Sequence, residues 1–125
     1  MEQINADWLP FEGGNTIRTK GSEEGIIIID IEHTEGARIT VEKDSRIAPF
    51  AITMGIYGLM FHTHFEGTKE ASEKYVGVSQ NRINKILAMY ETSNEKRDES
   101  WRTELDCRLK ELVDHPTITS TSDKE

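Results

Sequence analysis

Two histidines and a glutamate alternate in the stretch FHTHFEG (61–67), and these side chains are the strongest candidates for chemistry in the chain. His62 and His64 stand two residues apart, which on a β-strand places both imidazoles on one face, about 6.6–6.8 Å apart. Two such imidazoles can converge on one metal ion, and an imidazole beside a carboxylate can move protons. The alternative is a polar strand surface that does no chemistry and faces a partner.

A zinc ion usually takes at least three protein ligands, so the two histidines need a further donor. Glu66 lies four residues after His62, roughly 13 Å along a straight strand, and joins them only if the chain bends near Gly67. His33 is a donor of the right type, but the pattern of its own strand puts it on the core side. We therefore predict no catalytic residue and no cofactor. If zinc binds, the ligands are drawn from His62, His64, Glu66 and His33.

The phase of the strand expected over 58–65 decides where the histidines point. Its odd positions read Leu59, Phe61, Thr63 and Phe65, whereas its even positions read Met60, His62, His64 and Glu66. The period-two rule assigns the more apolar, odd-numbered face to the core. The sequence thus predicts an outward-facing binding surface made of the even-numbered residues, Met60, His62, His64 and Glu66.

Other reactive side chains give weaker signals. Asp30 and Glu32 share one face of a strand and could form a carboxylate pair for acid–base chemistry. Pairing of Glu32 with Arg38 on the next strand explains half of this pair without chemistry. Cys107 lies among charged residues with no histidine within a helical turn, so it is predicted to be an ordinary thiol.

A β-hairpin is the clearest local structure. The runs GIIIIDIEH (25–33) and ARITVEK (37–43) are rich in β-branched residues and are joined by the tripeptide TEG. A two-residue turn would mix polar and apolar side chains on both faces. A three-residue loop instead pairs Ile31 with Ile39 and makes one face apolar. We therefore predict a three-residue loop, with Gly36 in the left-handed conformation that such loops require.

The remaining segments complete an α+β fold. Strands are expected at 15–21, 47–54 and 58–65, and helices at about 69–92 and 95–114. Strands followed by helices are typical of α+β rather than alternating α/β folds. The prediction is an antiparallel sheet of four to five strands, roughly 15–66, with the two helices packed on one face. Gly77 inside the first helix suggests close packing of that helix on the sheet.

Composition bounds the class of protein. The 125 residues predict one domain over 1–116 and a polar, disordered tail over 117–125. The formal net charge of -8 disfavours nucleic acid and favours a basic protein partner. The N-terminus lacks the basic and apolar segments of a signal peptide, and there is a single cysteine. Together these features predict a soluble, cytoplasmic protein that does not bind membranes.

The function that the sequence favours is a small acidic interaction or regulatory protein, similar in size and charge to immunity or inhibitor proteins. It would bind a second protein or, through a sheet edge, another copy of itself as a homodimer. Two alternatives stay open. One is a small metal-dependent or acid–base enzyme using His62 and His64. The other is a small-ligand pocket between sheet and helices, lined by Met54, Tyr57, Phe61 and Tyr75.

Overall fold

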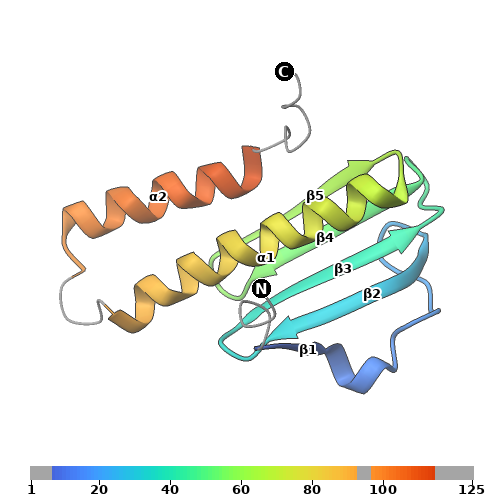
Figure 1. Cartoon of the computed structure of the whole chain (residues 1–125), viewed down its shortest axis with the longest axis horizontal. Coiled ribbons are helices and arrows are strands. Elements are labelled where there is room, and N and C mark those ends of the chain that lie inside the picture. The colour runs from blue at the N-terminus through green and yellow to red at the C-terminus, as the bar shows by residue number, and fades with distance from the viewer. Residues whose placement is uncertain (1–6, 93–96, 115–125) are drawn as a thin grey trace.

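The computed structural model describes residues 7–92 and 97–114, which form a sheet layer and a helix layer (Figure 1). The five strands of the antiparallel sheet follow one another in space in their chain order. They are β1 (Trp8–Pro10), β2 (Ile26–His33), β3 (Ala37–Lys43), β4 (Phe50–Ile56) and β5 (Met60–Glu66). The helices α1 (Lys69–Thr92) and α2 (Glu99–Asp114) come last. This confirms the predicted α+β fold; the predicted tail over 117–125 lies outside the described residues.

The β2–β3 hairpin has the predicted register. Ile31 lies opposite Ile39, and Glu32 lies opposite Arg38, with three residues in the loop. Gly36 has a φ of 113°, a value that is strained for any residue with a Cβ. The alternation of apolar and polar side chains was therefore sufficient to identify the loop length.

The prediction of a strand over 15–21 is wrong. This segment is irregular and contributes only an isolated bridge between Lys20 and Ile26, while the short β1 occupies the edge beside β2. Arg18 has a φ of 76°, which breaks any extended run. The hydroxyl of Thr19 donates to the carbonyl of Thr16, so side-chain hydrogen bonds take the place of a strand ladder.

The β4–β5 hairpin turns two residues later than expected. Its loop is Tyr57-Gly58-Leu59, and Gly58 has a φ of 77°. Gly55, in contrast, stays in β4 and pairs with Phe61. The earlier glycine is thus a strand residue and the later one makes the turn.

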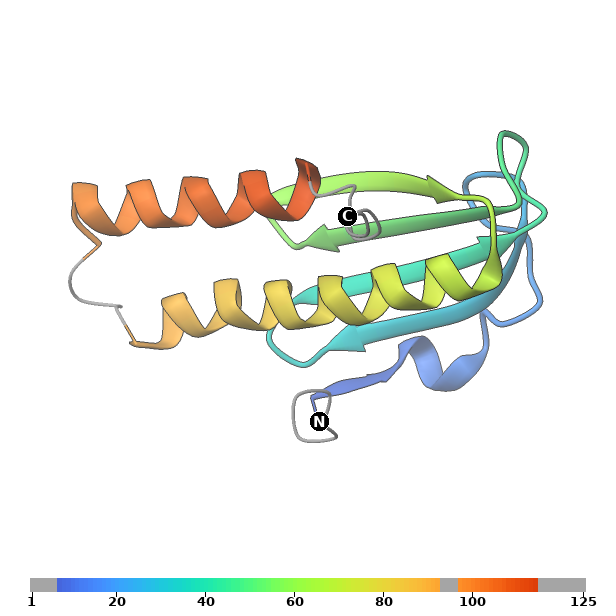
Figure 2. The ribbon, with the colours of Figure 1, turned by 45° about the horizontal axis from the view of Figure 1, so that its top comes forward.

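The apolar core lies between the sheet and α1, with α2 packed along α1 (Figure 2). Its fully buried side chains come from every layer: Ile39, Val41, Ile52, Met54, Tyr75, Ile83, Ile86 and Leu112. Gly77 does not mark close packing, because a Cβ there would meet nothing within 4 Å. Neither described helix combines the length and the apolar character that crossing a bilayer requires.

Candidate functional site

The structure reverses the predicted phase of β5. Met60, His62 and His64 lie opposite Ile56, Met54 and Ile52, whose side chains form the core under the helices. Phe61, predicted to be buried, is 76% exposed on the opposite face. The helices cover only one face of the sheet, and the apolar residues of β4 determine which face that is. The predicted outward orientation of Met60, His62, His64 and Glu66 is therefore wrong, and their role in binding stays a prediction.

His64 forms a compact cluster with residues of β5 and α1. Its ring stacks on Tyr75, with centroids 3.9 Å apart and planes within 7° of parallel. Its Nε2 lies 2.7 Å from Oε2 of Glu66, and both side chains are mostly buried. This is the one contact that the structure makes between the predicted site residues 62, 64, 66 and 33.

Tyr75 closes this cluster from the helix side. It is 1% exposed, and its hydroxyl has no hydrogen-bond partner within bonding geometry among the described residues. Burial raises the pKa of Tyr75 to about 12, although the nearby Ser79 hydroxyl opposes this rise. The phenol therefore stays protonated at neutral pH, and its ring is part of the core.

His33 lies apart from that cluster, whereas His62 borders it. Burial lowers the pKa of His62, as does the neighbouring His64, while Asp114 at the end of α2 acts in the opposite direction. His33 packs edge-on against Trp8 and accepts a hydrogen bond from the N–H of Glu35. It belongs to β2, three strands and roughly 14 Å from β5. Among residues 7–92 and 97–114, no three His, Cys, Asp or Glu side chains are grouped to hold a metal.

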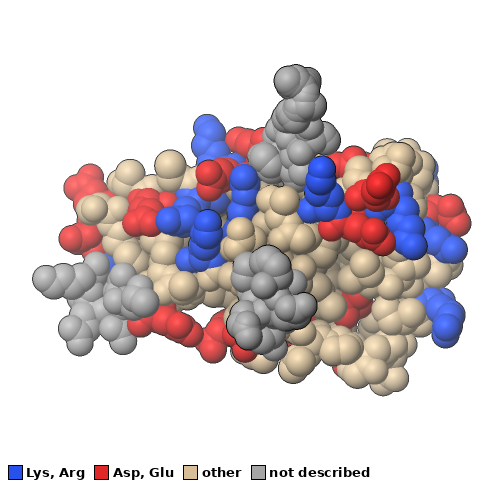
Figure 3. Space-filling view, viewed as in Figure 1, with Lys and Arg blue, Asp and Glu red and all other residues tan. Residues whose placement is uncertain are grey.

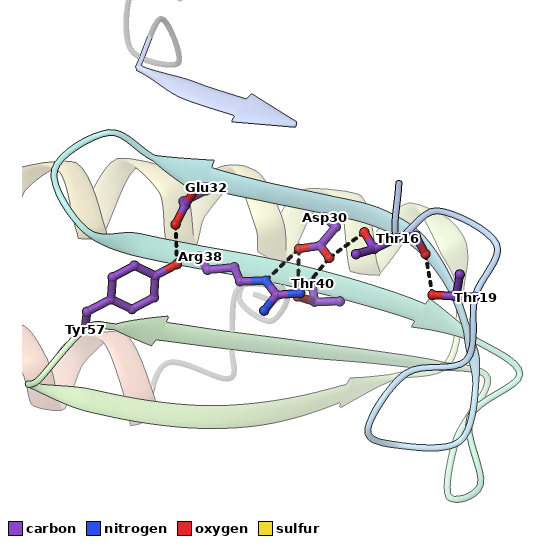
Figure 4. A network of polar contacts seen from close by, with 7 residues as sticks. All are labelled: Thr16, Thr19, Asp30, Glu32, Arg38, Thr40 and Tyr57. Carbon is purple, nitrogen blue, oxygen red and sulfur yellow. Dashed lines mark hydrogen bonds and ion pairs between the residues drawn. The ribbon is translucent and has the colours of Figure 1, made fainter. Parts of the chain in front are cut away.

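The open face of the sheet carries a polar network that sequence reasoning missed (Figure 4). Its centre is Asp30, which is 2% exposed and accepts hydrogen bonds from Arg38 at 2.7 and 2.9 Å. The hydroxyls of Thr16 and Thr40 donate to the same carboxylate at 2.7 and 3.1 Å. The guanidinium of Arg38 also lies 3.6 Å from the ring centroid of Phe11. The network ties the irregular N-terminal segment to the sheet.

The charges in this network are satisfied, which indicates a structural role. Burial alone would raise the pKa of Asp30, but the hydrogen bonds from Arg38, Thr16 and Thr40 together lower it. Glu32, although opposite Arg38 in register, instead accepts a hydrogen bond from the Tyr57 hydroxyl at 2.6 Å. The two carboxylates thus have separate hydrogen-bond partners.

A shallow groove of about 480 Å³ runs along the uncovered face beside this network. Small residues of β4, Thr53 and Gly55, form part of its lining, and Tyr57 and Phe61 lie at one end. Glu42 lies at the other end, where its carboxylate accepts hydrogen bonds from the backbone N–H groups of Glu23 and Gly25. The groove therefore combines exposed aromatic rings with a polar end.

The predicted pocket between sheet and helices is also wrong. Met54 and Tyr75 are buried in the core, whereas Tyr57 and Phe61 are 54% and 76% exposed on the opposite side of the sheet. Met54, Tyr57 and Phe61 line the groove on the open face, and Tyr75 is not part of that lining. Cys107 is an exposed, free thiol on α2.

The outer edge of β5 pairs with no other described strand, because β5 is last in the sheet order. The N–H of Tyr57 donates to the carbonyl of Gly36 at 2.9 Å. This bond places the adjacent residues, Ala37 of β3 and Ile56 of β4, in a non-hydrogen-bonded pair. Ile56 therefore directs its backbone groups to Met60 of β5. By alternation, the β5 residues whose N–H and C=O face outward are Phe61, Thr63 and Phe65.

Charge does not single out a binding surface on the helix side. Figure 3 shows Lys and Arg interspersed with Asp and Glu across the helices rather than one acidic patch. Protein-family models, curated proteins and solved structures contain no match to this chain.

Proposed function

We propose that this chain is a small, non-catalytic interaction protein that binds a protein partner through the β5 side of its sheet. The observation that supports this most strongly is the exposure of Phe61, an aromatic strand residue held in solvent beside an apolar-edged groove. Phenylalanine contributes a large apolar area when it is buried, and aromatic residues are enriched at protein interfaces. The proposal includes a cytoplasmic setting and regulation of the partner, as an immunity or inhibitor protein provides.

The backbone of β5 also favours partner binding at this edge of the sheet. A seven-residue edge strand with outward N–H and C=O groups is a template for adding another strand. The opposite edge is less suited to this, because β1 has three residues and one of them is Pro10, which has no N–H to donate. The exposed side chain of Phe61 and the backbone groups that can pair with another strand therefore lie on the same strand, β5.

The matched test compares Phe61→Asp with Leu9→Asp. Leu9 is 52% exposed and lies on the same sheet face at the far edge, so its variant adds the same charge away from β5. Both chains and the wild type are used as bait, and bound proteins are quantified by mass spectrometry. We expect partners, including other copies of the chain, to be lost with Phe61→Asp and retained with Leu9→Asp. Equal recovery with both variants would contradict the proposal.

A second candidate function, a metal-dependent or acid–base enzyme, is supported by the 2.7 Å contact between His64 and Glu66. An imidazole held by a carboxylate is a common arrangement in both zinc sites and general bases. The test is elemental analysis of untagged protein and of His64→Ala. Stoichiometric zinc in the wild type that is lost in the variant would favour the metal-dependent enzyme, and its absence from both would exclude a zinc enzyme.

A further inference from the structure

The five central residues of β5 form a palindrome: Phe61-His62-Thr63-His64-Phe65 reads the same in both directions. Two copies of such a strand that pair antiparallel about a two-fold axis at Thr63 present identical residues to each other. Phe61 of one copy then lies opposite Phe65 of the other, and His62 lies opposite His64. Closed two-fold interfaces of this self-complementary kind are the commonest in homo-oligomers.

The backbone parity of β5 fits this arrangement. The centre of the palindrome, Thr63, is one of the residues whose N–H and C=O face outward, and so are Phe61 and Phe65. In the two-fold pairing these three residues of each copy meet as hydrogen-bonded pairs and form about six interstrand bonds. A slip by two residues would leave outward groups of Phe61 or Phe65 without a partner. The pairing that matches the side chains is therefore also the one that satisfies the backbone.

The side chains add to the complementarity on both faces. On the open face each Phe61, which is largely in solvent in one copy, would pack against Phe65 of the other. On the helix face the opposing residues are His62 and His64, and burial favours the neutral form of His62. No carboxylate faces another carboxylate within the five-residue palindrome.

We propose that β5 pairs with β5 of a second copy, so that the two sheets join into one continuous antiparallel sheet. This deepens the proposed function, on which it rests, by naming a second copy as the partner at that edge. One strand from each side is a small contact compared with the roughly 1,600 Å² of a standard interface. The dimer is therefore weak, with a dissociation constant on the order of micromolar.

The test exploits the outward N–H of Thr63. Thr63→Pro removes an intermolecular donor but no bond to β4, because a proline whose missing N–H faces outward is tolerated at a sheet edge. Thr63→Val is the matched control, since both variants lose the hydroxyl contact with Thr53 and only one loses the N–H. Sedimentation velocity from about 1 to 200 µM measures the monomer–dimer equilibrium. We expect the wild type and Thr63→Val to dimerise, and Thr63→Pro to dimerise at least about tenfold more weakly.

A cross-link provides a second measurement that does not depend on the fold of the proline variant. Thr63→Cys in a Cys107→Ser background places two thiols at the symmetry axis, where Cα atoms about 5.5 Å apart permit a disulfide. Leu9→Cys in the same background is the control at the other edge. We expect Thr63→Cys to form a disulfide-linked dimer much faster than Leu9→Cys.

Two results would overturn the second copy as partner: a wild type that stays monomeric over the whole range, or cross-linking at 63 no faster than at 9. Equal dimerisation of Thr63→Pro and Thr63→Val would place any dimer elsewhere. If the chain is monomeric but Phe61→Asp still loses other proteins, the proposed function stands with a different partner. If neither self-association nor capture depends on Phe61, both proposals fail.

Discussion

Replacing Asp30 with asparagine should destabilise the fold without changing its shape. The carboxylate is buried and accepts four hydrogen bonds, two of them from the guanidinium of Arg38. An amide of the same size keeps one acceptor oxygen, turns the other acceptor into a donor and removes the negative charge. Its NH₂ group would then face donors rather than acceptors.

The magnitude follows from the number and type of the lost bonds. Hydrogen bonds to charged groups contribute about 1.5–3 kcal/mol each, and at least one bond from Arg38 would be lost. The Arg38 side chain is 35% exposed, so water replaces part of what the carboxylate provided, and the loss is smaller than for a fully buried pair. We expect Asp30→Asn to lower the free energy of unfolding by about 2 kcal/mol.

The pH dependence distinguishes this mechanism from a packing defect. The pKa of Asp30 is lowered in the folded protein, so its carboxylate stabilises the fold above the unfolded value near 3.9. That stabilisation is lost as pH falls through the folded pKa. The difference between wild type and Asp30→Asn should therefore be largest at pH 7 and shrink below about pH 4.

Urea unfolding followed by circular dichroism at pH 7, 5 and 3 measures both quantities. Glu32→Gln is the control, because Glu32 lies on the same face and its carboxylate accepts a hydrogen bond from the exposed Tyr57 instead. A double-mutant cycle with Arg38→Met should give a coupling of at least about 1 kcal/mol. A variant as stable as the wild type at pH 7, or a deficit that does not shrink in acid, would refute the reasoning.

Three further substitutions test the packing by chemical denaturation. Gly77→Ala should stabilise the chain by about 0.5–1 kcal/mol, because its Cβ meets open space on α1; a loss would mean that this helix face is covered. Gly25→Ala should destabilise by about 1–3 kcal/mol, since its Cβ would lie 2.6 Å from the carbonyl oxygen of Lys43; an unchanged midpoint would contradict that contact. Tyr75→Phe should be neutral or stabilising by up to about 1 kcal/mol, because it removes a buried hydroxyl without a partner, and a clear loss would show that the hydroxyl is bonded.

Local pattern predicted the β2–β3 hairpin because both strands carry the information that sets their register. Ile31 and Ile39 have to share a face, and only a three-residue loop allows it. The first helix was equally readable from its spacing, since α1 begins and ends at the predicted residues. The second helix ends at the predicted residue, but α2 begins at Glu99 rather than at about 95. In these segments, neighbours in the sequence are also the residues that determine the structure.

The phase of β5 could not be read in the same way, because it depends on its neighbour β4 and on which face the helices cover. Within β5, phenylalanines are more apolar than histidines, and the period-two rule therefore chose the wrong face. The register with Ile52 and Met54 overrides that preference and draws the imidazoles under the helices. Asp30 was misjudged for a related reason, since its partners Thr16 and Arg38 come from segments whose approach no local pattern reveals.

The observed orientation of β5 gives its histidines and phenylalanines different roles from the predicted ones. The imidazoles, half-covered by α1 and α2, complete the rim of the core, and His64 stacks on Tyr75 there. The phenylalanines, which local hydrophobicity assigns to the core, are left on a face that the described helices do not cover. An aromatic residue held in solvent on an edge strand raises the risk of association. If that association is the function, the strand whose histidines suggested a metal site specifies a partner strand instead.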